Sequence, residues 1–472
     1  MNQATSLDER LRLQLEVQRA AFDADPAPSL ALRRDRLQRL HALITAHADD
    51  VVQAIASDFG HRARQETLLA DVFTVAASAR HAMKHLRAWS RPRRVATQLH
   101  FLPASNRLLR QPLGVVGIVA PWNYPVNLAF TPAVGALAAG NRVMIKPSEL
   151  TPATSALMSR LVAERFAPDE MLVVPGDADV GRAFTALPFD HLFFTGSTAV
   201  GRVVAQAAAR QLVPCTLELG GKSPAIVDAS CDLRTTAERL AFGKLFNAGQ
   251  TCVAPDYVLA PRALVEPLAR EVADAMRRLF PRIAGNADYT SIVADRHVAR
   301  LQHLLADARE RGARVIATHD DAPTDRRLVP QLLLDVDDDM AVMKEEIFGP
   351  LLPFVPYDDV AGALAYVRAH DRPLALYWFG RDAAVRERVL SQSHAGGVTV
   401  NDCIWHLGQE NQPFGGVGPS GTGAYHGEWG FRTFSKEKPV FSQAAFDGTR
   451  LFRPPYGATF DRLLGLLSRL AG

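Results

Sequence analysis

The chain has few cysteines and no long apolar segment. Its 472 residues include four cysteines, which show neither a C-x-x-C pair nor the Cys/His spacing of a metal site. So few thiols exclude a disulfide framework and are typical of a reducing compartment. No apolar run approaches the roughly 20 residues that span a bilayer, and residues 1–20 lack the apolar core of a secretory signal. We therefore expect a cytoplasmic protein without a membrane span or a bound metal.

An excess of charge of one sign is also missing. The chain carries 53 basic and 50 acidic residues, so its net charge is +3. A short basic run at residues 91–94 is interpreted as a solvated loop or the entry to a hairpin, because no nucleic-acid module accompanies it. Composition is ordinary for a globular protein, with 48% hydrophobic and 22% charged residues. A chain of this length is expected to divide into two or three domains.

Helix-like and strand-like segments alternate along most of the chain. The first ~90 residues show helical spacing, with Leu37, Leu40 and Ile44 on one face. The alternation that follows predicts βαβ units and parallel sheets, arranged as two α/β layers rather than one. The strand-like runs of the first series are 115–120, 143–146, 171–174 and 191–195, and those of the second are 225–227, 315–317, 376–379 and 398–401.

Further elements are expected outside these series. Residues 95–102 and 107–111 predict a hairpin around a turn at 103–106, and residues 439–442 predict one more strand. Leucines at helical spacing in residues 460–470 predict an amphipathic helix. We interpret this helix as docked on the protein or on a partner subunit rather than on a membrane, because it is short and only weakly basic.

Cys252 is the candidate nucleophile. A lone cysteine is more often a small buried hydrophobe than a nucleophile. Here Gly249-Gln250-Thr251 precedes it and predicts a polar, uncrowded turn after a helix, on which a thiolate is free to attack a carbonyl carbon. The pKa of a free thiol is about 8.5, so a local lowering would help at neutral pH.

Glu218 is the candidate general base. It lies between Leu217 and Leu219 in a strand-like run that ends in a glycine pair. Half-burial raises the pKa of a carboxyl group toward the range that suits a base. The alternative is a glutamate on an edge strand facing water. The glycine pair favours the base, because it allows the backbone to approach a ligand.

The segment Pro121-Trp122-Asn123-Tyr124-Pro125 follows the first buried strand. Attack of a thiolate on an aldehyde forms an alkoxide, and a preorganised amide donor such as that of Asn123 stabilises such an oxyanion by about 10²–10³ in rate. An asparagine that only caps the following helix is the competing interpretation.

Three further segments suit a dinucleotide. Lys146 and Glu149 follow a strand, where their side chains can bond ribose hydroxyls. The charge of Glu149 favours a 2′-hydroxyl over a 2′-phosphate and therefore NAD over NADP; a helix cap by Ser148 is the competing interpretation. Gly196-Ser197 joins a strand to a helix start, where backbone N–H groups suit a pyrophosphate. Residues 345–350 could, taken alone, equally form a capped loop.

Together these segments resemble the NAD(P)-dependent aldehyde dehydrogenase superfamily, over residues 59–442. The matched blocks, in the family's order, are PWNYP (121–125), KPSE (146–149), FTGSTAVG (194–201), LELGGKSP (217–224), GQTC (249–252), EEIFGP (345–350) and PFGGVG (413–418). The resemblance implies that Cys252 is the nucleophile, that Glu218 is the base, and that Asn123 and the Cys252 N–H form the oxyanion hole. The cofactor contacts that it implies are Trp122, Lys146, Glu149, Gly196, Ser197, Glu346 and Phe348.

Finer features are similar to one branch of the superfamily. The short N-terminus, Tyr124 and the segment GAYHG (423–427) resemble the class 3 branch, whose members are usually dimers and often accept NADP as well as NAD. The segments DFG (58–60), PFDHL (188–192), APDYV (254–258) and PYG (455–457) are similar to bacterial coniferyl-aldehyde dehydrogenases, which oxidise an aromatic enal to its acid. The loop at residues 401–411, with Trp405 and His406, is expected to shape the substrate mouth.

The resemblance implies an α/β fold with two Rossmann-like parallel-sheet domains and a small β element. The expected divisions are an NAD-binding domain at 1–86 and 109–217, a catalytic domain at 218–407, a bridging or oligomerisation element at 87–108 and 408–445, and a tail helix at 446–472. The expected partners are a small aldehyde and, through the bridging element, a second subunit in a homodimer. Alternatives are a class 3 enzyme of medium- or long-chain aliphatic aldehydes and an enzyme that passes its acyl group to coenzyme A; a non-catalytic relative would have lost Cys252 or Glu218.

Overall fold

The computed structural model describes residues 6–471, and the N-terminal residues up to Thr5 and the terminal Gly472 lie outside the described part. The chain begins with a helical layer. Ser6 and Ser29 start its first two helices, because their hydroxyls accept hydrogen bonds from the N–H groups of Glu9 and Leu32. The expected helical face is buried, with Leu37, Leu40 and Ile44 at 0% exposure. The elements of the layer are α1 (Leu7–Ala24), α2 (Leu30–Ala46), α3 (Ala48–Phe59), α4 (Arg64–Thr67), the wider helical turn η1 (Leu68–Phe73) and α5 (Thr74–Ser90).

A six-stranded sheet forms the centre of the first α/β unit. Its order is β15-β7-β6-β3-β4-β5, and every pairing is parallel except that of β15 with β7. The strands are β3 (Val115–Val119), β4 (Arg142–Lys146), β5 (Met171–Val173), β6 (His191–Thr195), β7 (Cys215–Glu218) and β15 (Gly421–Thr422). The four connecting helices are α6 (Asn127–Ala139), α7 (Pro152–Arg165), α8 (Ala178–Thr185) and α9 (Thr198–Arg210).

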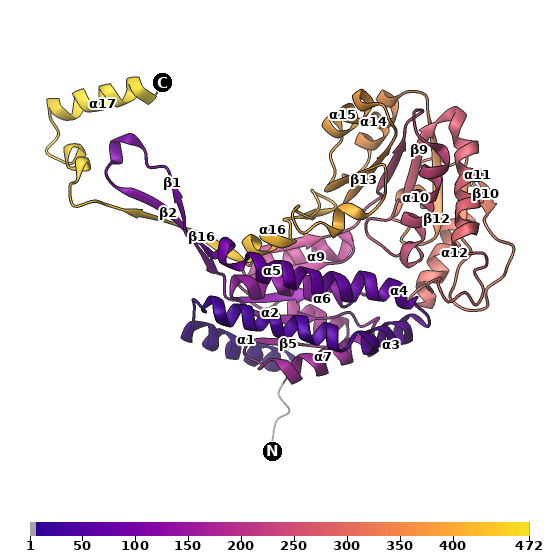
Figure 1. Ribbon diagram of the computed structural model, residues 1–472, viewed down its shortest axis with the longest axis horizontal. Coiled ribbons are helices and arrows are strands. Elements are labelled where there is room, and N and C mark those ends of the chain that lie inside the picture. Colours follow the sequence, from indigo (N-terminus) through magenta and orange to yellow (C-terminus); the bar gives the residue numbers. More distant parts are fainter. Residues whose placement is uncertain (1–5, 472) are drawn as a thin grey trace, which may run out of the picture.

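The strand order of this sheet reverses between β3 and β6. The chain runs from β3 outward through β4 to β5, then returns to β6 and continues to β7 on the other side. Right-handed connections therefore place α6 and α7 on one face and α8 and α9 on the other. Helices α2, α3 and α5 of the helical layer cover the first face, where α2 and α5 contact α6 and α3 contacts α7 (Figure 1). Helix α1 instead contacts α8 on the second face. In open parallel sheets ligands bind beyond the carboxyl ends of the strands at such a reversal.

A seven-stranded sheet forms the second unit, in the order β10-β11-β12-β9-β8-β13-β14. Only the β10–β11 pairing in it is antiparallel. Its strands are β8 (Pro224–Val227), β9 (Tyr257–Pro261), β10 (Arg314–Ala317), β11 (Gln331–Leu334), β12 (Leu351–Tyr357), β13 (Ala375–Phe379) and β14 (Gly397–Val400). The helices around it are α10 (Leu233–Leu245), η3 (Phe246–Gly249), α11 (Arg262–Leu279), α12 (Asp295–Glu310), α13 (Ala341–Lys344), α14 (Val360–Ala369), α15 (Ala383–Gln392) and η4 (Trp405–Gly408). Helix α16 (Gly427–Thr433) instead packs on α5 and α6 of the first unit.

The two parallel-sheet units confirm the predicted fold class, although three strands of the second sheet were not predicted. These are β9, β11 and β12. In β12, Pro353 and Pro356 argue against a central strand when the sequence is read alone. The chain passes from the first sheet to the second between Glu218 and Pro224, whereas the exact domain bounds stay a prediction. Among residues 6–471, no helix has both the length and the apolar character that crossing a membrane requires.

A three-stranded antiparallel sheet projects from the body as an arm (Figure 1). The predicted hairpin exists, but the strand predicted at 95–102 is wrong: β1 ends at Val95 and a helical turn follows. The strand predicted at 439–442 begins earlier and pairs along the whole of β2. The elements of the arm are β1 (Arg93–Val95), η2 (Leu99–Phe101), β2 (Ser105–Pro112), β16 (Ser435–Ser442), η5 (Gly448–Phe452) and α17 (Ala458–Ala471).

Candidate active site

The loops that follow β3, β4, β6 and β7 lie at one edge of the six-stranded sheet, because parallel strands end on the same side. Asn123 follows β3, Lys146 ends β4 with Glu149 beyond it, Gly196 and Ser197 follow β6, and Glu218 ends β7. The Gly196 N–H donates to the Glu218 carbonyl oxygen at 3.0 Å, which joins two of these loops directly. Segments that are far apart in the sequence therefore lie side by side in the structure.

The turn before Cys252 has a strained backbone. Asn247 and Ala248 have φ angles of 54° and 52°, which non-glycine residues rarely adopt, and Gly249 follows with φ of 78°. A Cβ atom added to Gly249 would clash with the carbonyl oxygen of Gly349. The Gln250 side chain holds the turn in place: its Nε2 donates to the Asn247 and Ser291 carbonyl oxygens at 3.0 Å, and its Oε1 accepts from the Val293 N–H at 3.0 Å.

The expectation of an uncrowded turn is wrong. Asn247 and Gln250 are fully buried and Thr251 is nearly so, while Cys252 itself is partly exposed. Burial, together with the nearby charges of Glu346 and Glu218, raises the pKa of the Cys252 thiol to about 12. The thiol is therefore protonated at neutral pH in the protein alone. Both carboxylates therefore act on Cys252 through their charge.

Glu218 is the last residue of β7 and is 2% exposed. Its strand is flanked by β6 on one side and β15 on the other, so the interpretation as a water-facing edge residue is wrong. Neither carboxyl oxygen has a hydrogen-bond partner within residues 6–471. Burial raises the pKa of Glu218 well above its ordinary value, because the ionised form is poorly solvated there.

Asn123 contacts the cysteine turn. It is 3% exposed, and its Nδ2 donates to the Gln250 carbonyl oxygen at 3.1 Å. A primary amide has two N–H groups, so one remains for another acceptor. The interpretation of Asn123 as a helix cap is wrong, because Asp71 caps α6 by accepting from the Val126 and Asn127 N–H groups at 3.1 and 3.0 Å.

Lys146 and Glu149 lie together beyond β4. The Lys146 side chain is 3% exposed; its Nζ donates to the Pro147 carbonyl oxygen at 2.8 Å and lies 3.9 Å from Glu149 Oε2. Burial lowers the pKa of Lys146, although Glu149 and Asp177 oppose this. Ser148 Oγ accepts from the Leu150 N–H at 3.2 Å, so it supports the loop and does not cap α7.

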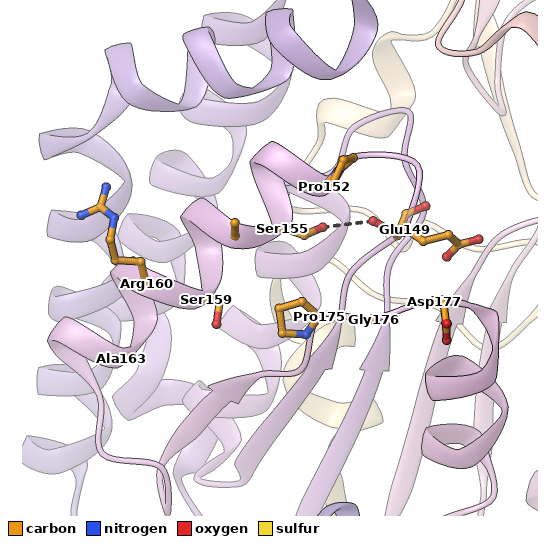
Figure 2. Close-up of a pocket in the computed structure, with 11 residues that line it drawn as sticks. Glu149, Pro152, Ser155, Ser159, Arg160, Ala163, Pro175, Gly176 and Asp177 are labelled. Carbon is orange, nitrogen blue, oxygen red and sulfur yellow. Dashed lines mark hydrogen bonds between the residues drawn. The ribbon is translucent and has the colours of Figure 1, made fainter. Parts of the chain in front are cut away.

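Glu149 also lines a pocket of about 590 Å³ between α7 and the loop after β5 (Figure 2). The α7 wall carries the hydroxyls of Ser155 and Ser159, and the facing loop carries Gly176 and Asp177. The Ser155 hydroxyl donates to the Ser148 carbonyl oxygen at 3.0 Å. Lys146 does not line this pocket, but its Nζ lies 3.9 Å from Glu149 Oε2.

Gly196 and Ser197 begin α9. Ser197 Oγ accepts from the Val200 N–H at 3.4 Å and caps the helix. A Cβ atom on Gly196 would lie 2.6 Å from the ring of Phe194, so this position requires glycine. The hydroxyl of the preceding Thr195 is buried without a hydrogen-bond partner among the described residues.

The loop at 345–350 comes from the second sheet and closes the site from the other side. A Cβ atom on Gly220 would clash with the Glu346 carboxylate, so this glycine permits their close approach. Burial and the charge of Asp256 raise the pKa of Glu346 to about 8. Phe348 has φ of 50°, and its ring meets that of Trp122 edge to face at 5.4 Å. The loop is therefore fixed against the segment that carries Asn123.

A row of aromatic rings leads outward from the cysteine turn. The Tyr124 hydroxyl is hydrogen-bonded to Thr251 Oγ1 at 2.5 Å, and its ring lies 6.2 Å from that of Phe246. Phe242 continues the row, and its ring stacks on Trp405 at 5.8 Å and 13°. Trp405 is 43% exposed. The sequence indicated Trp405 but not Phe242 or Phe246, because aromatic residues next to a helix read as core.

Fold and site define an α/β enzyme in which a cysteine turn, a buried glutamate and the strand ends typical of dinucleotide binding meet at one edge. No cluster of three or more metal-ligating side chains occurs within the described residues. The model of the aldehyde dehydrogenase family matches residues 8–440. The chain belongs to the aldehyde dehydrogenase family.

Individual relatives agree with this assignment. A probable coniferyl aldehyde dehydrogenase of Pseudomonas aeruginosa is 51% identical over 447 residues, which are 95% of this chain and 94% of that protein. Aldehyde dehydrogenase family 3 member H1 of Arabidopsis thaliana is 37% identical over 95% of this chain and 93% of its own length. The solved structure of substrate-bound AldH from Staphylococcus aureus has a TM-score of 0.91 at 36% identity, covering 97% of this chain and 99% of the other.

Proposed function

We propose that the protein oxidises an aromatic aldehyde such as coniferaldehyde to its carboxylic acid, with NAD as the oxidant. The observation that carries the proposal is the meeting of Cys252, Glu218 and Asn123 at the reversal of the six-stranded sheet. A relative at 51% identity that is described as a probable coniferyl aldehyde dehydrogenase supports the aromatic substrate.

The residues at the sheet edge fit a dinucleotide. Lys146 Nζ has three N–H groups and donates one to Pro147, so it can also bond ribose hydroxyls, with Glu149 as an acceptor. Gly196 and the capped start of α9 suit the pyrophosphate, and the unpartnered hydroxyl of Thr195 lies just before them. Glu346, Phe348 and Trp122 would hold the nicotinamide end. The charge of Glu149 favours NAD over NADP.

The chemistry begins at the Cys252 sulfur. The thiol first releases its proton to water, and the thiolate then adds to the aldehyde carbon. The resulting alkoxide accepts hydrogen bonds from the free Asn123 N–H and the Cys252 backbone N–H. A bound NAD, held by the residues at the sheet edge, would supply the acceptor for the hydride of this carbon and a positive ring charge that favours the thiolate. The thioester on Cys252 is hydrolysed by a water whose proton Glu218 removes. A raised pKa makes Glu218 a stronger base for this step.

The aromatic row supports the substrate class. Tyr124, Phe246, Phe242 and Trp405 form a line of rings from the cysteine turn to the surface, and an aromatic aldehyde would pack against their faces. An unbranched aliphatic aldehyde would gain burial but no ring stacking. Retention of Glu218 favours hydrolysis over transfer of the acyl group to coenzyme A.

A substrate panel tests the proposal. Cinnamyl-type, benzyl and medium-chain aliphatic aldehydes are compared by kcat/KM, with NAD and NADP, and with and without coenzyme A. We expect coniferaldehyde with NAD to give the highest kcat/KM and free acid as product. A clear preference for aliphatic aldehydes would refute the aromatic substrate while leaving the oxidation intact. A requirement for coenzyme A would refute the hydrolytic step.

The proposed assembly is a homodimer in the cytoplasm. The arm exposes large apolar side chains that a second subunit would cover: Leu99, Phe101, Leu102, Phe441, Phe446, Leu451, Tyr456, Leu464 and Leu466. The outer strands of its sheet also offer unpaired edges to a partner. The free thiols of all four cysteines suit a reducing compartment. Light scattering at several concentrations should give twice the chain mass, and a stable monomer would contradict the dimer.

A further inference from the structure

Arg62 lies directly beneath the segment that carries Asn123. Its side chain is fully buried, in the connection between α3 and α4. Nη1 donates to the Asn123 carbonyl oxygen at 3.0 Å and lies 3.2 Å from Asp71 Oδ2. The guanidinium carbon lies 4.8 Å from the centre of the Tyr124 ring and 5.3 Å from that of Phe59. Arg62 therefore holds both the backbone and an aromatic side chain of this segment.

Two carboxylates extend this contact in opposite directions. Asp71, which pairs with Arg62, accepts from the Val126 and Asn127 N–H groups and so anchors the start of α6. Glu66, whose charge also interacts with Arg62, accepts from the Asn247 N–H at 3.1 Å. Arg62 thus contacts the segment of Asn123 directly, whereas Glu66 binds the backbone of the strained turn before Cys252.

The Asn123 carbonyl oxygen is the point where the two halves meet. It accepts one hydrogen bond from Arg62 and a second from Asn247 Nδ2 at 3.1 Å, which fills both of its lone pairs. Asn247 Nδ2 also donates to the Gln250 carbonyl oxygen, the same atom that receives Asn123 Nδ2. The position of the Asn123 backbone carbonyl therefore sets the direction in which the Asn123 side-chain amide points relative to Cys252.

We propose that Arg62 is a positioning residue for the oxidation, which fixes the Asn123 amide at the place where the alkoxide forms. This inference rests on the proposed function and deepens it. Arg62 does not touch the substrate; it acts through the Asn123 carbonyl and the ring of Tyr124. A displacement of about 1 Å in a group that stabilises a transition state costs on the order of 10²-fold in rate.

The test compares Arg62→Met with a matched variant, Arg142→Met. Arg142 is also a buried arginine, 6% exposed, that donates to backbone carbonyls, those of Asp169 and Ala21 at 3.1 and 3.0 Å. It begins β4, at the end of the sheet opposite the site. Both variants lose a buried guanidinium, so both should lose stability. Only Arg62→Met should lower kcat, by about 10–100-fold, with the KM for aldehyde and NAD changed less than about threefold.

A second readout separates positioning from general loosening of the site. The rate of Cys252 alkylation by iodoacetamide should stay close to that of the wild type in Arg62→Met, because the thiol is held by Gln250 and not by Arg62. Free guanidinium should restore part of kcat in Arg62→Ala but not in Arg142→Ala. An unchanged kcat, or an equal loss of kcat and alkylation rate, would overturn the inference.

Arg62→Lys covers the case in which Arg62→Met fails to fold. Lysine keeps the charge opposite Asp71 but lacks the flat guanidinium that lies over the rings of Tyr124 and Phe59. We expect a folded enzyme with kcat lowered about 10-fold, and a wild-type kcat would overturn the inference. Failure of the proposed function is distinguishable, because then the wild-type protein itself would not oxidise aldehydes.

Discussion

The loops of the six-stranded sheet and those of the seven-stranded sheet reach the site with different backbones. Between β3 and α9, which includes Asn123, Lys146 and Ser197, no non-glycine residue has a positive φ. On the other side, Asn247, Ala248 and Phe348 all have φ between 50° and 54°. The cofactor side thus uses ordinary strand-to-helix loops, whereas the nucleophile side stores strain that buried side chains such as Gln250 maintain.

The comparison explains why the two sides tolerate change differently. An ordinary loop is specified by its own residues, so a substitution there alters a local contact. A strained turn is specified by its surroundings, so a substitution there moves the nucleophile as well. Substitutions on the two sides should therefore differ in how strongly they change kcat.

The largest effect is expected from Glu218→Gln. Removal of the general base should lower kcat by about 10²–10⁴-fold, while NAD reduction still shows an initial burst, because the thioester forms but is not hydrolysed. A base acts only when ionised, so the raised pKa of Glu218 should move the acidic limb of the kcat profile above the ordinary range for a glutamate. Stopped-flow absorbance and a pH profile check both. Loss of the burst itself would place Glu218 before the oxidation.

The strained turn is probed by Gly249→Ala, with Gly312→Ala as its control. Both glycines have positive φ, 78° and 99°, but only at Gly249 would the added methyl group meet a backbone carbonyl. We expect Gly312→Ala to cost about 1–2 kcal/mol of unfolding free energy, with an unchanged kcat. Gly249→Ala should cost more and lower kcat by about 10–100-fold. Equal behaviour of the two variants would contradict a turn held by its surroundings. Denaturant unfolding and steady-state kinetics supply the measurements.

On the ordinary side, Glu149→Gln should change cofactor choice alone. Loss of the negative charge near the ribose should raise the kcat/KM ratio of NADP to NAD by about 5–10-fold, which corresponds to roughly 1 kcal/mol of repulsion. Glu164→Gln, on the outer surface of α7, is the matched control. A cofactor ratio unchanged in Glu149→Gln would show that this carboxylate does not face the ribose.

The smallest effect concerns folding stability and Glu346. Its pKa is raised from 4.5 to about 8, so the folded state favours the protonated form. The contribution of Glu346 to the free energy of unfolding is therefore complete below about pH 4.5 and is lost as the pH rises through about 8. Melting temperatures of Glu346→Gln between about pH 5 and 9 should fall less than those of the wild type. Glu238→Gln, on the exposed side of α10, should follow the wild type. A steeper fall in Glu346→Gln would reverse the sign of this linkage.

Much of the fold could be predicted because its signals are local. Period-two and helical patterns, with glycine and proline at the breaks, indicated β3, β4, β5 and β6 and the helices α6 and α7, whereas α8 was not predicted. The strands that were missed lack such signals: β12 contains two prolines, and the short β11 is a run of leucines that reads equally as helix. Strand β1 was misplaced because the exposed arm has no buried face to impose alternation.

The site divides in the same way. Motifs indicated Cys252, Glu218 and Asn123, but the burial of the cysteine turn was not predicted, because that burial comes from Gly349 and Ser291, far away in the sequence. The role of Arg62 was not predicted either, because the sequence around a single arginine in a helix-rich segment does not indicate which residues it will contact. Its role depends on contacts with residues that lie 61 positions away or beyond the next helix.

The most direct test of the account is mass spectrometry of the enzyme quenched during turnover of coniferaldehyde with NAD. Glu218→Gln should carry an acyl group on the peptide that contains Cys252. The mass of this peptide should rise by that of the acyl group, less the thiol hydrogen that it replaces. Cys252→Ser should carry none, and Cys231→Ser should behave like the wild type. Product formation by Glu218→Gln and the wild type without any adduct on Cys252 would contradict covalent catalysis by this cysteine.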